Sequence, residues 1–321
     1  MHNRLLISLV SFALLALYGC ASTAPRTYAV PLEQARQRPT TDAARKIRPE
    51  SSRPDLAKSF DEAVERGDHA WQSGQTDIAV YLYVQAMSFK PRDVMTLKKL
   101  GAIEQSRGNL PLAAQALILA AEGEPTDAAL TGRLGLIYVA LEEDESAITW
   151  LRRSVDNGST DWHVYDGLGI ALQRRGDNTA ALQSLDSAVQ FGPGESVPLL
   201  HQGQIRLKTR DYTGAEVALR AALSAGNAPA AWRLLGEVHA KQRRYGEAIE
   251  SLLRALDAAE AYSTAGQLAL ANGDNAVALS YFEKASATSP TYLQNVARDA
   301  AIARERMAVS MQIGQAPAAI P

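Results

Sequence analysis

The sequence predicts an all-α protein, a right-handed superhelical solenoid of about seven helix pairs with a C-terminal cap helix. Two observations predict this class: seven glycines recur at nearly constant spacing, and an alanine follows each of them twelve residues later. Successive glycines are 34, 34, 34, 34, 33 and 30 residues apart. The glycines are Gly67, Gly101, Gly135, Gly169, Gly203, Gly236 and Gly266, and the alanines are Ala79, Ala113, Ala147, Ala181, Ala215, Ala248 and Ala278. Such periodic self-similarity is typical of repeats that pack on their neighbours.

Each repeat is expected to contain two helices, and the repeats follow one another from Phe60 to Tyr292 without a long interruption. The small Gly and Ala let the two backbones approach, larger Leu, Tyr, Trp and Phe side chains fill the space between, and Pro stops the second helix. This period and pattern resemble the tetratricopeptide repeat, with the glycine at position eight of each unit. The resemblance implies that the first helix of each pair lines a concave groove that binds proteins.

Two units depart from the pattern. The sixth is only 30 residues long, shortened around Asp257 to Ala261, and lacks its closing Pro. We expect a tighter turn there, or a second helix that is one turn shorter. The third unit ends in Asn157-Gly158-Ser159 instead of Pro. Gly158 is expected to stop that helix in the left-handed conformation.

The remaining segments predict the domain organisation. Residues 1–19 form a signal peptide, 20–58 a linker, 59–292 the solenoid, 293–312 a cap helix rich in Ala, Arg and Glu, and 313–321 a disordered tail. The linker is rich in Pro, Ser, Thr and Arg, which favours a flexible tether. Its basic excess could attract anionic lipid headgroups, although a merely solvated linker is the simpler interpretation.

The N-terminus predicts export and lipidation. Arg4 precedes a 13-residue apolar run, Leu5 to Leu17, too short for an ordinary membrane span and typical of a secretory signal. The run leads into Leu17-Tyr18-Gly19-Cys20, which resembles the lipobox of bacterial lipoproteins. The alternative is an ordinary signal peptide with a chance cysteine.

Cys20 is the only cysteine of the chain, so an internal disulfide and a metal–thiolate cluster are excluded. The resemblance implies a covalent lipid on Cys20, and several acyl chains anchor a protein stably. Ala21 and Ser22 follow Cys20, so the Asp that keeps proteins at the inner membrane is lacking, and the resemblance implies an outer-membrane anchor with the body facing the periplasm.

The tetratricopeptide resemblance places the groove at positions two, five, nine and twelve of each first helix. The predicted partner-binding residues are Trp71, Met95, Lys98, Gln105, Leu136, Val139, His163, Asp166, Ile170, Gln173, Val197, Leu200, Gln204, Leu207, Arg233 and Glu237. Apolar side chains concentrate in the middle of this set, which suits an amphipathic helix or an extended segment. The alternative is that the superhelix closes over these residues and they belong to the core.

Some partner classes are disfavoured. The clamp that some family members use for chaperone C-termini needs Lys and Asn at set positions of the groove. At the groove position after Lys98, where Asn would be needed, this chain has Ala102. A net charge of −2 does not indicate the excess of basic residues that is typical of nucleic-acid-binding proteins. Acidic residues outnumber basic ones after the linker, so a strongly acidic partner is not expected.

Catalytic motifs are missing from the sequence. The histidines after the signal are scattered, with no HExxH pair, and there is no GxSxG elbow or phosphate-binding glycine loop. The sequence therefore predicts a protein that is not an enzyme and that has no cofactor apart from the lipid on Cys20.

A lipid anchor combined with a repeat solenoid is typical of envelope assembly factors. The segment Asp161 to Leu172, followed by Arg175-Gly176-Asp177, resembles the tight-adherence (Flp) pilus assembly lipoproteins. The resemblance implies a scaffold that helps a secretin or pilus to assemble, by protein contacts and with possible homo-oligomers. Two alternatives stay open: an adaptor for periplasmic hydrolases or proteases, and a scaffold for polysaccharide export.

Overall fold

The computed structural model describes residues 55–226, 229–289 and 293–314, and within these ranges every regular element is a helix. The pairs are α2 (Phe60–Gln72) with α3 (Thr76–Phe89), α4 (Val94–Ser106) with α5 (Leu110–Gly123), α6 (Ala128–Ala140) with α7 (Asp144–Asp156), α8 (Trp162–Arg174) with α9 (Asn178–Phe191), α10 (Ser196–Lys208) with α11 (Tyr212–Ala225), α12 (Pro229–Lys241) with α13 (Tyr245–Leu253), and α14 (Ala258–Ala271) with α15 (Asn275–Thr288). Helix α16 (Leu293–Gly314) follows them. The predicted fold class, seven helix pairs and a final helix, is confirmed.

Several sequence-based expectations concern residues outside the described part of the chain. They are the signal peptide (1–19), the lipidated Cys20, the linker up to residue 54, and residues 315–321 of the tail. These stay predictions.

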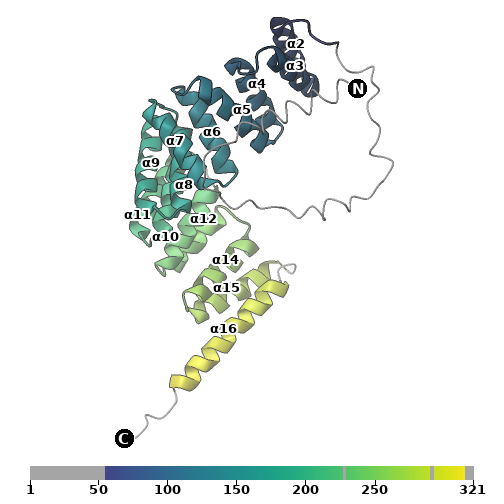
Figure 1. Ribbon diagram of the computed structural model, residues 1–321. Coiled ribbons are helices and arrows are strands. Elements are labelled where there is room, and N and C mark those ends of the chain that lie inside the picture. The colour runs from purple at the N-terminus through teal and green to yellow at the C-terminus, as the bar shows by residue number, and fades with distance from the viewer. Residues whose placement is uncertain (1–54, 227–228, 290–292, 315–321) are drawn as a thin grey trace, which may run out of the picture. The chain divides into compact units, whose positions relative to one another are not determined.

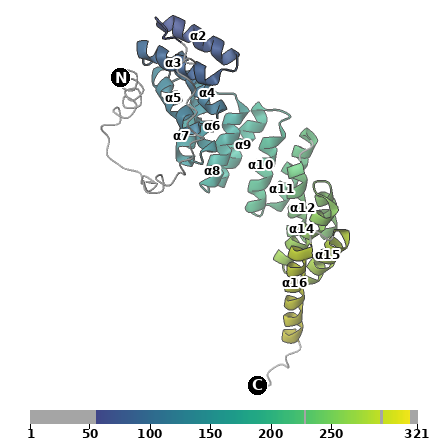
Figure 2. The ribbon, with the colours of Figure 1, turned by 90° about the vertical axis from the view of Figure 1, so that its right-hand side faces the viewer.

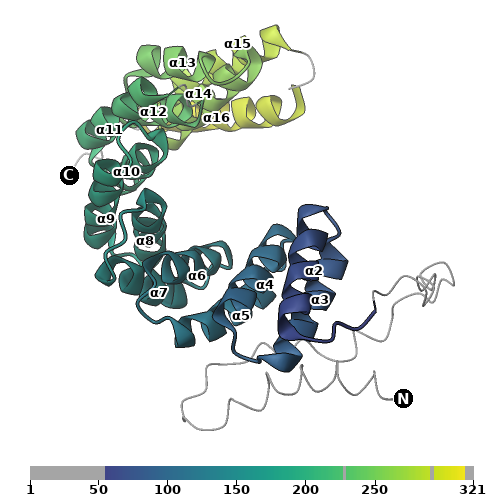
Figure 3. The ribbon, with the colours of Figure 1, turned by 90° about the horizontal axis from the view of Figure 1, so that it is seen from above.

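The helices stack in chain order within residues 54–321 (Figures 1 and 2). Each helix contacts the next one along the chain, and the first helices of neighbouring units, from α6 to α14, also contact each other. Figure 3 shows these even-numbered helices on the inner side of the row. Side chains on their free faces therefore lie next to one another across unit boundaries.

Aspartates start many of the helices. Asp93, Asp127 and Asp161 stand immediately before α4, α6 and α8, and each carboxylate accepts a hydrogen bond from a first-turn backbone N–H. Asp177 and Asp211 do the same for the second helices α9 and α11. This capping satisfies N–H groups that have no partner within the helix. The aspartates recur with the repeat, so each unit begins its helices at equivalent residues.

The glycine ladder marks the helix crossings, as predicted. A Cβ atom added to any of the seven glycines would lie 2.5–2.8 Å from the side chain sixteen residues later. These partners are Tyr83, Leu117, Leu151, Leu185, Leu219, Leu252 and Phe282, all almost fully buried. The seven alanines of the ladder are completely buried. Close backbone approach thus leaves room for one large side chain per pair, and these side chains form the core.

Both departures from the repeat have the predicted consequence. In the sixth unit, α13 has 9 residues, whereas the second helices of the other units have 13 or 14. In the third unit, Gly158 adopts φ 83° after α7. Its N–H bonds to the carbonyl of Val155, and the N–H of Ser159 bonds to that of Ser154. This is the Schellman pattern that ends a helix at a glycine.

The final helix covers the end of the stack. Val296, Ala300 and Ala303 of α16 are buried and pack with Ala278 and Phe282 of α15. Arg298, Arg304 and Glu305 on other sides of the helix are exposed. One apolar face on the last pair and polar side chains elsewhere are the features expected of a capping helix. It extends two residues beyond the predicted end, to Gly314.

Candidate binding surface

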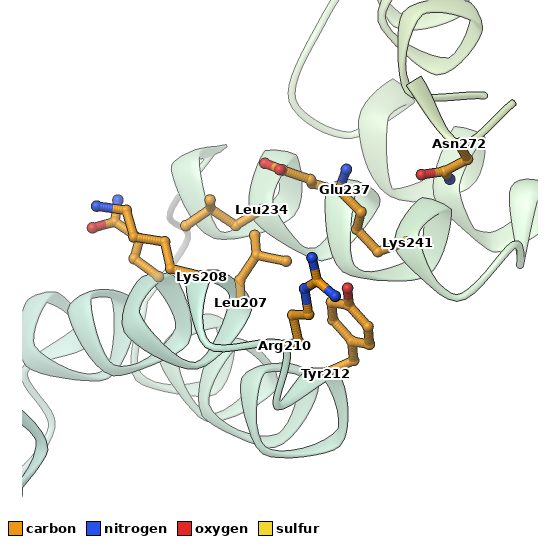
Figure 4. A pocket seen from close by; sticks show the side chains of 9 residues that line it. Leu207, Lys208, Arg210, Tyr212, Leu234, Glu237, Lys241 and Asn272 are labelled. Atoms are coloured by element: carbon orange, nitrogen blue, oxygen red, sulfur yellow. The ribbon is translucent and has the colours of Figure 1, made fainter. Parts of the chain in front are cut away.

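The first helices of units five, six and seven border a hollow on the surface, which we call the C-terminal hollow. It consists of a pocket of about 640 Å³ and an adjoining one of about 240 Å³ that share Gln204, Leu234 and Glu237. The first is lined by Gln204, Leu207, Lys208, Arg210, Tyr212, Leu234, Glu237, Lys241 and Asn272 (Figure 4), and the second adds Ala230, Arg233, Leu252, Thr264 and Leu268. The larger volume lies in the range of ligand-binding pockets.

Helical spacing brings these side chains together. Arg233, Glu237 and Lys241 follow one another at intervals of four on α12, and Gln204 and Lys208 do so on α10. Residues four apart lie on the same face of a helix, so each helix contributes a row of polar groups. Because α10 contacts α12, the two rows lie side by side.

The apolar wall of the hollow is anchored in the core. Leu207, Tyr212 and Leu234 are half-buried and pack against a cluster that contains Leu219 and Leu235. Their remaining exposed surface faces the hollow (Figure 4). A ligand here would therefore meet rigid apolar contacts beside charged groups.

The charges of the hollow have no ionic partners among the described residues. Lys208, Arg210, Arg233 and Lys241 are four cations, Glu237 is one carboxylate, and none of the five forms an ion pair in the described part of the chain. Several neighbouring basic residues do form ion pairs: Arg206 with Asp211, Arg220 with Glu216, Arg243 with Asp274, and Arg244 with Glu216 and Glu247. With four cations and one carboxylate, the hollow therefore has an excess of positive charge, and none of these groups is paired within the described part of the chain.

Arg210 has an unusual backbone. Its φ is +64°, in the left-handed region, and the N–H of Asp211 bonds back to the carbonyl of Arg206 over 2.8 Å. Helices commonly end this way, but with glycine at this residue, because a Cβ atom disfavours the conformation. Four units follow that preference with Gly74, Gly108, Gly176 and Gly273, each seven residues after its ladder glycine. Arg210 stands at the equivalent position of unit five, at the rim of the hollow.

An ionic network behind the hollow joins units five and six. Hydrogen bonds from Arg244, at 2.8 Å, and from Arg220, at 2.8 Å, lower the pKa of Glu216 from 4.5 to about 2, although partial burial opposes the shift. Arg244 also bonds Glu247, and these two carboxylates raise its pKa. The network joins α11 to the start of α13 and thereby stabilises the packing of the helices around the hollow.

Four of the predicted groove residues come together in the hollow: Gln204, Leu207, Arg233 and Glu237. Of the others, Trp71, Met95, His163 and Val197 are exposed elsewhere, and Ile170 and Gln173 are half-buried on α8. The partner-binding role of the whole set stays a prediction.

Several predicted groove residues are engaged inside the protein. Leu136 and Val139 pack on the core of units three and four, and Leu200 packs on that of units five and six. Lys98 pairs with Glu124 and Asp127, and Gln105 accepts a hydrogen bond from Arg133 at 2.7 Å. Asp166 is buried, with its Oδ1 2.7 Å from Nδ1 of His201. The expected apolar stripe in the middle of the groove is thus partly used for packing between units.

Lys208, Arg210, Tyr212, Leu234 and Lys241 were not among the predicted residues, yet they line the larger pocket. One signal in the sequence could have identified Arg210: it occupies the position seven after a ladder glycine, where most units have another glycine. The other four fall outside the four groove positions that the family pattern supplies.

Within the described ranges, no group of three or more His, Cys, Asp or Glu side chains is placed to hold a metal ion. Among the same residues, no helix combines the length and apolarity needed to cross a bilayer.

Comparisons with known proteins agree with this architecture. Tetratricopeptide repeat models match residues 99–161, 200–263 and 259–292. A tetratricopeptide repeat protein from Parabacteroides merdae superposes with a TM-score of 0.55 at 16% identity, covering 77% of this chain and all (100%) of that one. The matched segments and the helix pairs show that the chain contains tetratricopeptide repeats, which generally bind protein partners.

Other solved structures share the fold. A crystal structure of MamA protein matches with a TM-score of 0.50 at 22% identity, covering 52% of this chain and 91% of that one. The hetero-tetramer Cut9–Hcn1 of the APC/C matches with a TM-score of 0.50 at 17% identity, covering 77% of this chain and 49% of that one. No curated protein matches the sequence.

Proposed function

We propose that this protein is a non-catalytic scaffold, held at the bacterial outer membrane by a lipid on Cys20, that binds envelope proteins on its inner face and helps a pilus or secretin to assemble. The observation that carries the binding function is the C-terminal hollow, where a pocket of about 640 Å³ gathers uncompensated charges beside apolar walls. A rigid stack of repeats presents this surface without needing any reactive group.

The structural part of the proposal rests on how the units are joined. Each pair is fixed by its ladder glycine, and the contacts between first helices keep the inner faces continuous. Side chains on rigid elements lose little freedom on binding, which favours recognition of a partner by shape and charge.

The envelope role rests on sequence. The lipobox-like segment ending at Cys20 supports export and anchoring, and the resemblance of Asp161 to Leu172 to the tight-adherence pilus lipoproteins supports the choice of machine. An adaptor for periplasmic hydrolases or a polysaccharide-export scaffold would use the same anchor and the same surface, so the partner must distinguish them.

The experiment is deletion of the gene in the source organism combined with affinity capture of the tagged full chain after mild cross-linking. We expect piliation to fall on deletion and a secretin or pilus subunit to be captured. Capture of a cell-wall hydrolase or an export polymerase, with piliation intact, would replace pilus assembly by one of the alternatives.

A further inference from the structure

We infer that the C-terminal hollow binds an acidic segment of a partner protein, and that Arg210 is held in a strained conformation in order to place its guanidinium there. This inference rests on the proposed function and gives the chemistry of the partner. It concerns the surface bounded by Lys208, Arg210, Arg233 and Lys241.

The uncompensated charge is the first argument. Several basic residues around the hollow have carboxylate partners within the chain, such as Arg243 with Asp274 at 2.8 Å, whereas the four cations of the hollow have none among the described residues. Carboxylates of a partner would complete charge-assisted hydrogen bonds, and an arginine can hold a carboxylate with two parallel bonds.

The backbone of Arg210 is the second, independent argument. A non-glycine residue in the left-handed region is strained, and such strain tends to persist where a side chain has a function. The structure also has Glu142 and Arg243 at φ 59° and 61° in the equivalent positions of units three and six. Arg243 uses the position for its ion pair with Asp274, but Arg210 directs its side chain over the hollow without a partner in the described chain (Figure 4).

The other groups of the hollow favour a peptide over a nucleic acid or a lipid surface. Leu207, Tyr212 and Leu234 offer apolar contacts that a phosphate backbone would not use. Glu237 lies among the cations, where its carboxylate can accept hydrogen bonds from peptide N–H groups, which a phosphate backbone lacks. The best fit is therefore a segment in which acidic and apolar side chains alternate.

This chemistry differs from the expectation drawn from total charge. An acidic excess over the whole body argued against an acidic partner. Charges farther away than the Debye length, about 8 Å at physiological salt, contribute little to a contact. The local cations of the hollow therefore decide its preference.

The test uses the full chain and a fluorescent peptide in which Glu and Leu alternate, with binding followed by anisotropy at low and at moderate salt. The control probe has Lys in place of each Glu. We expect binding of the Glu peptide, weakening as salt rises, and much weaker binding of the Lys peptide. A single-stranded DNA oligonucleotide and vesicles containing anionic lipid serve as competitors.

Two substitutions of Arg210 separate its charge from its strain. Arg210→Gly should weaken binding of the Glu peptide about 5–30-fold, the loss of one charge-assisted contact, and raise the melting temperature by about 2–4 °C by relieving the strain. Arg210→Gln should weaken binding similarly with no rise in melting temperature.

Two control variants lie elsewhere. Glu142→Gly should raise the melting temperature without weakening binding, because it relieves the same strain away from the hollow. Arg152→Gln removes an exposed positive charge on α7 and should change neither.

The inference is overturned if the Glu peptide binds no better than the Lys peptide, or if neither Arg210 variant weakens it. It is also overturned if the oligonucleotide or the vesicles compete as well as unlabelled Glu peptide. These results are distinct from failure of the proposed function: a chain that captures secretin or pilus subunits equally well with Arg210→Gly would keep its function and lose this site.

Discussion

Gly169 and Leu185 touch across the fourth helix pair so closely that a Cβ atom at residue 169 would lie 2.8 Å from Cγ of Leu185. The same relation, sixteen residues apart, recurs in all seven units. The crossing of each pair is therefore set by one glycine and one large side chain.

Gly169→Leu tests this relation. The new side chain would overpack the crossing, and we expect the free energy of unfolding to fall by about 1–3 kcal/mol, measured by urea denaturation. Gly246→Ala is the control, because a Cβ atom there meets nothing within 4 Å. It should be neutral or stabilising by about 0.5 kcal/mol, as a helical alanine is favoured over glycine. Equal stability of Gly169→Leu and the unmodified chain would mean that the crossing is placed wrongly.

Glu216 gives a pH-dependent prediction. Its pKa is lowered from 4.5 to about 2 in the folded chain, chiefly by Arg244. A lowered carboxyl pKa stabilises the fold at pH values above the unfolded pKa, and that stabilisation is lost as the pH falls from about 4.5 through 2. Glu216→Gln should therefore cost about 1–2 kcal/mol at neutral pH, with the difference shrinking towards pH 2.

Urea titrations at neutral and at acidic pH measure this difference. Glu145→Gln is the control, because Glu145 pairs with Arg175 at 2.6 Å but its side chain is 78% exposed. It should change stability by less than about 0.5 kcal/mol at either pH. A cost for Glu216→Gln that is the same at both pH values would rule out the ionic explanation.

Asp166 and His201 link the first helices of units four and five. Replacing the buried Asp166 with alanine removes the partner of His201 Nδ1, 2.7 Å away, and should lower the free energy of unfolding by about 1–2 kcal/mol. His163→Ala removes an exposed partner of Asp161 and should cost at most about 0.5 kcal/mol. Similar costs for the two variants would show that the link between α8 and α10 adds no stability.

Cys20→Ala tests the predicted anchor. If Cys20 is acylated, mass spectrometry of the mature chain should show its N-terminal cysteine with covalent lipid, and the protein should fractionate with membranes. The alanine variant should then leave the membrane fraction. A mature chain that begins elsewhere, with Cys20 unmodified, would favour the ordinary signal peptide.

The fold could be predicted from the sequence because its main contacts repeat. The spacing of Gly236 and Ala248 in the sequence is enough to identify the crossing of the sixth pair. The shortened spacing to Gly266 predicts the short helix α13. Local signals of this kind depend on residues close in the chain, which the repeat brings into the same arrangement each time.

The surface could be predicted only in part. Repeat positions correctly indicated that Gln204 and Glu237 share a face, but they do not show whether a neighbouring helix covers that face. Leu136 illustrates this, because a Cβ atom at Gly167 of the next unit would lie 2.7 Å from its Cδ2. That contact depends on the packing angle between units, which no single repeat specifies. The role of Arg210 likewise depends on its backbone conformation together with the absence of a partner among the described residues.

Site-specific photocross-linking in the source organism tests the central claim, that the C-terminal hollow binds a protein partner, most directly. A photoreactive amino acid would replace Leu207 or Leu234 inside the hollow, and Val217, which is 66% exposed on α11, would serve as the control position. The account predicts a discrete adduct with one envelope protein from both hollow positions and none from residue 217. Adducts from residue 217 alone, or the same adducts from all three positions, would contradict it.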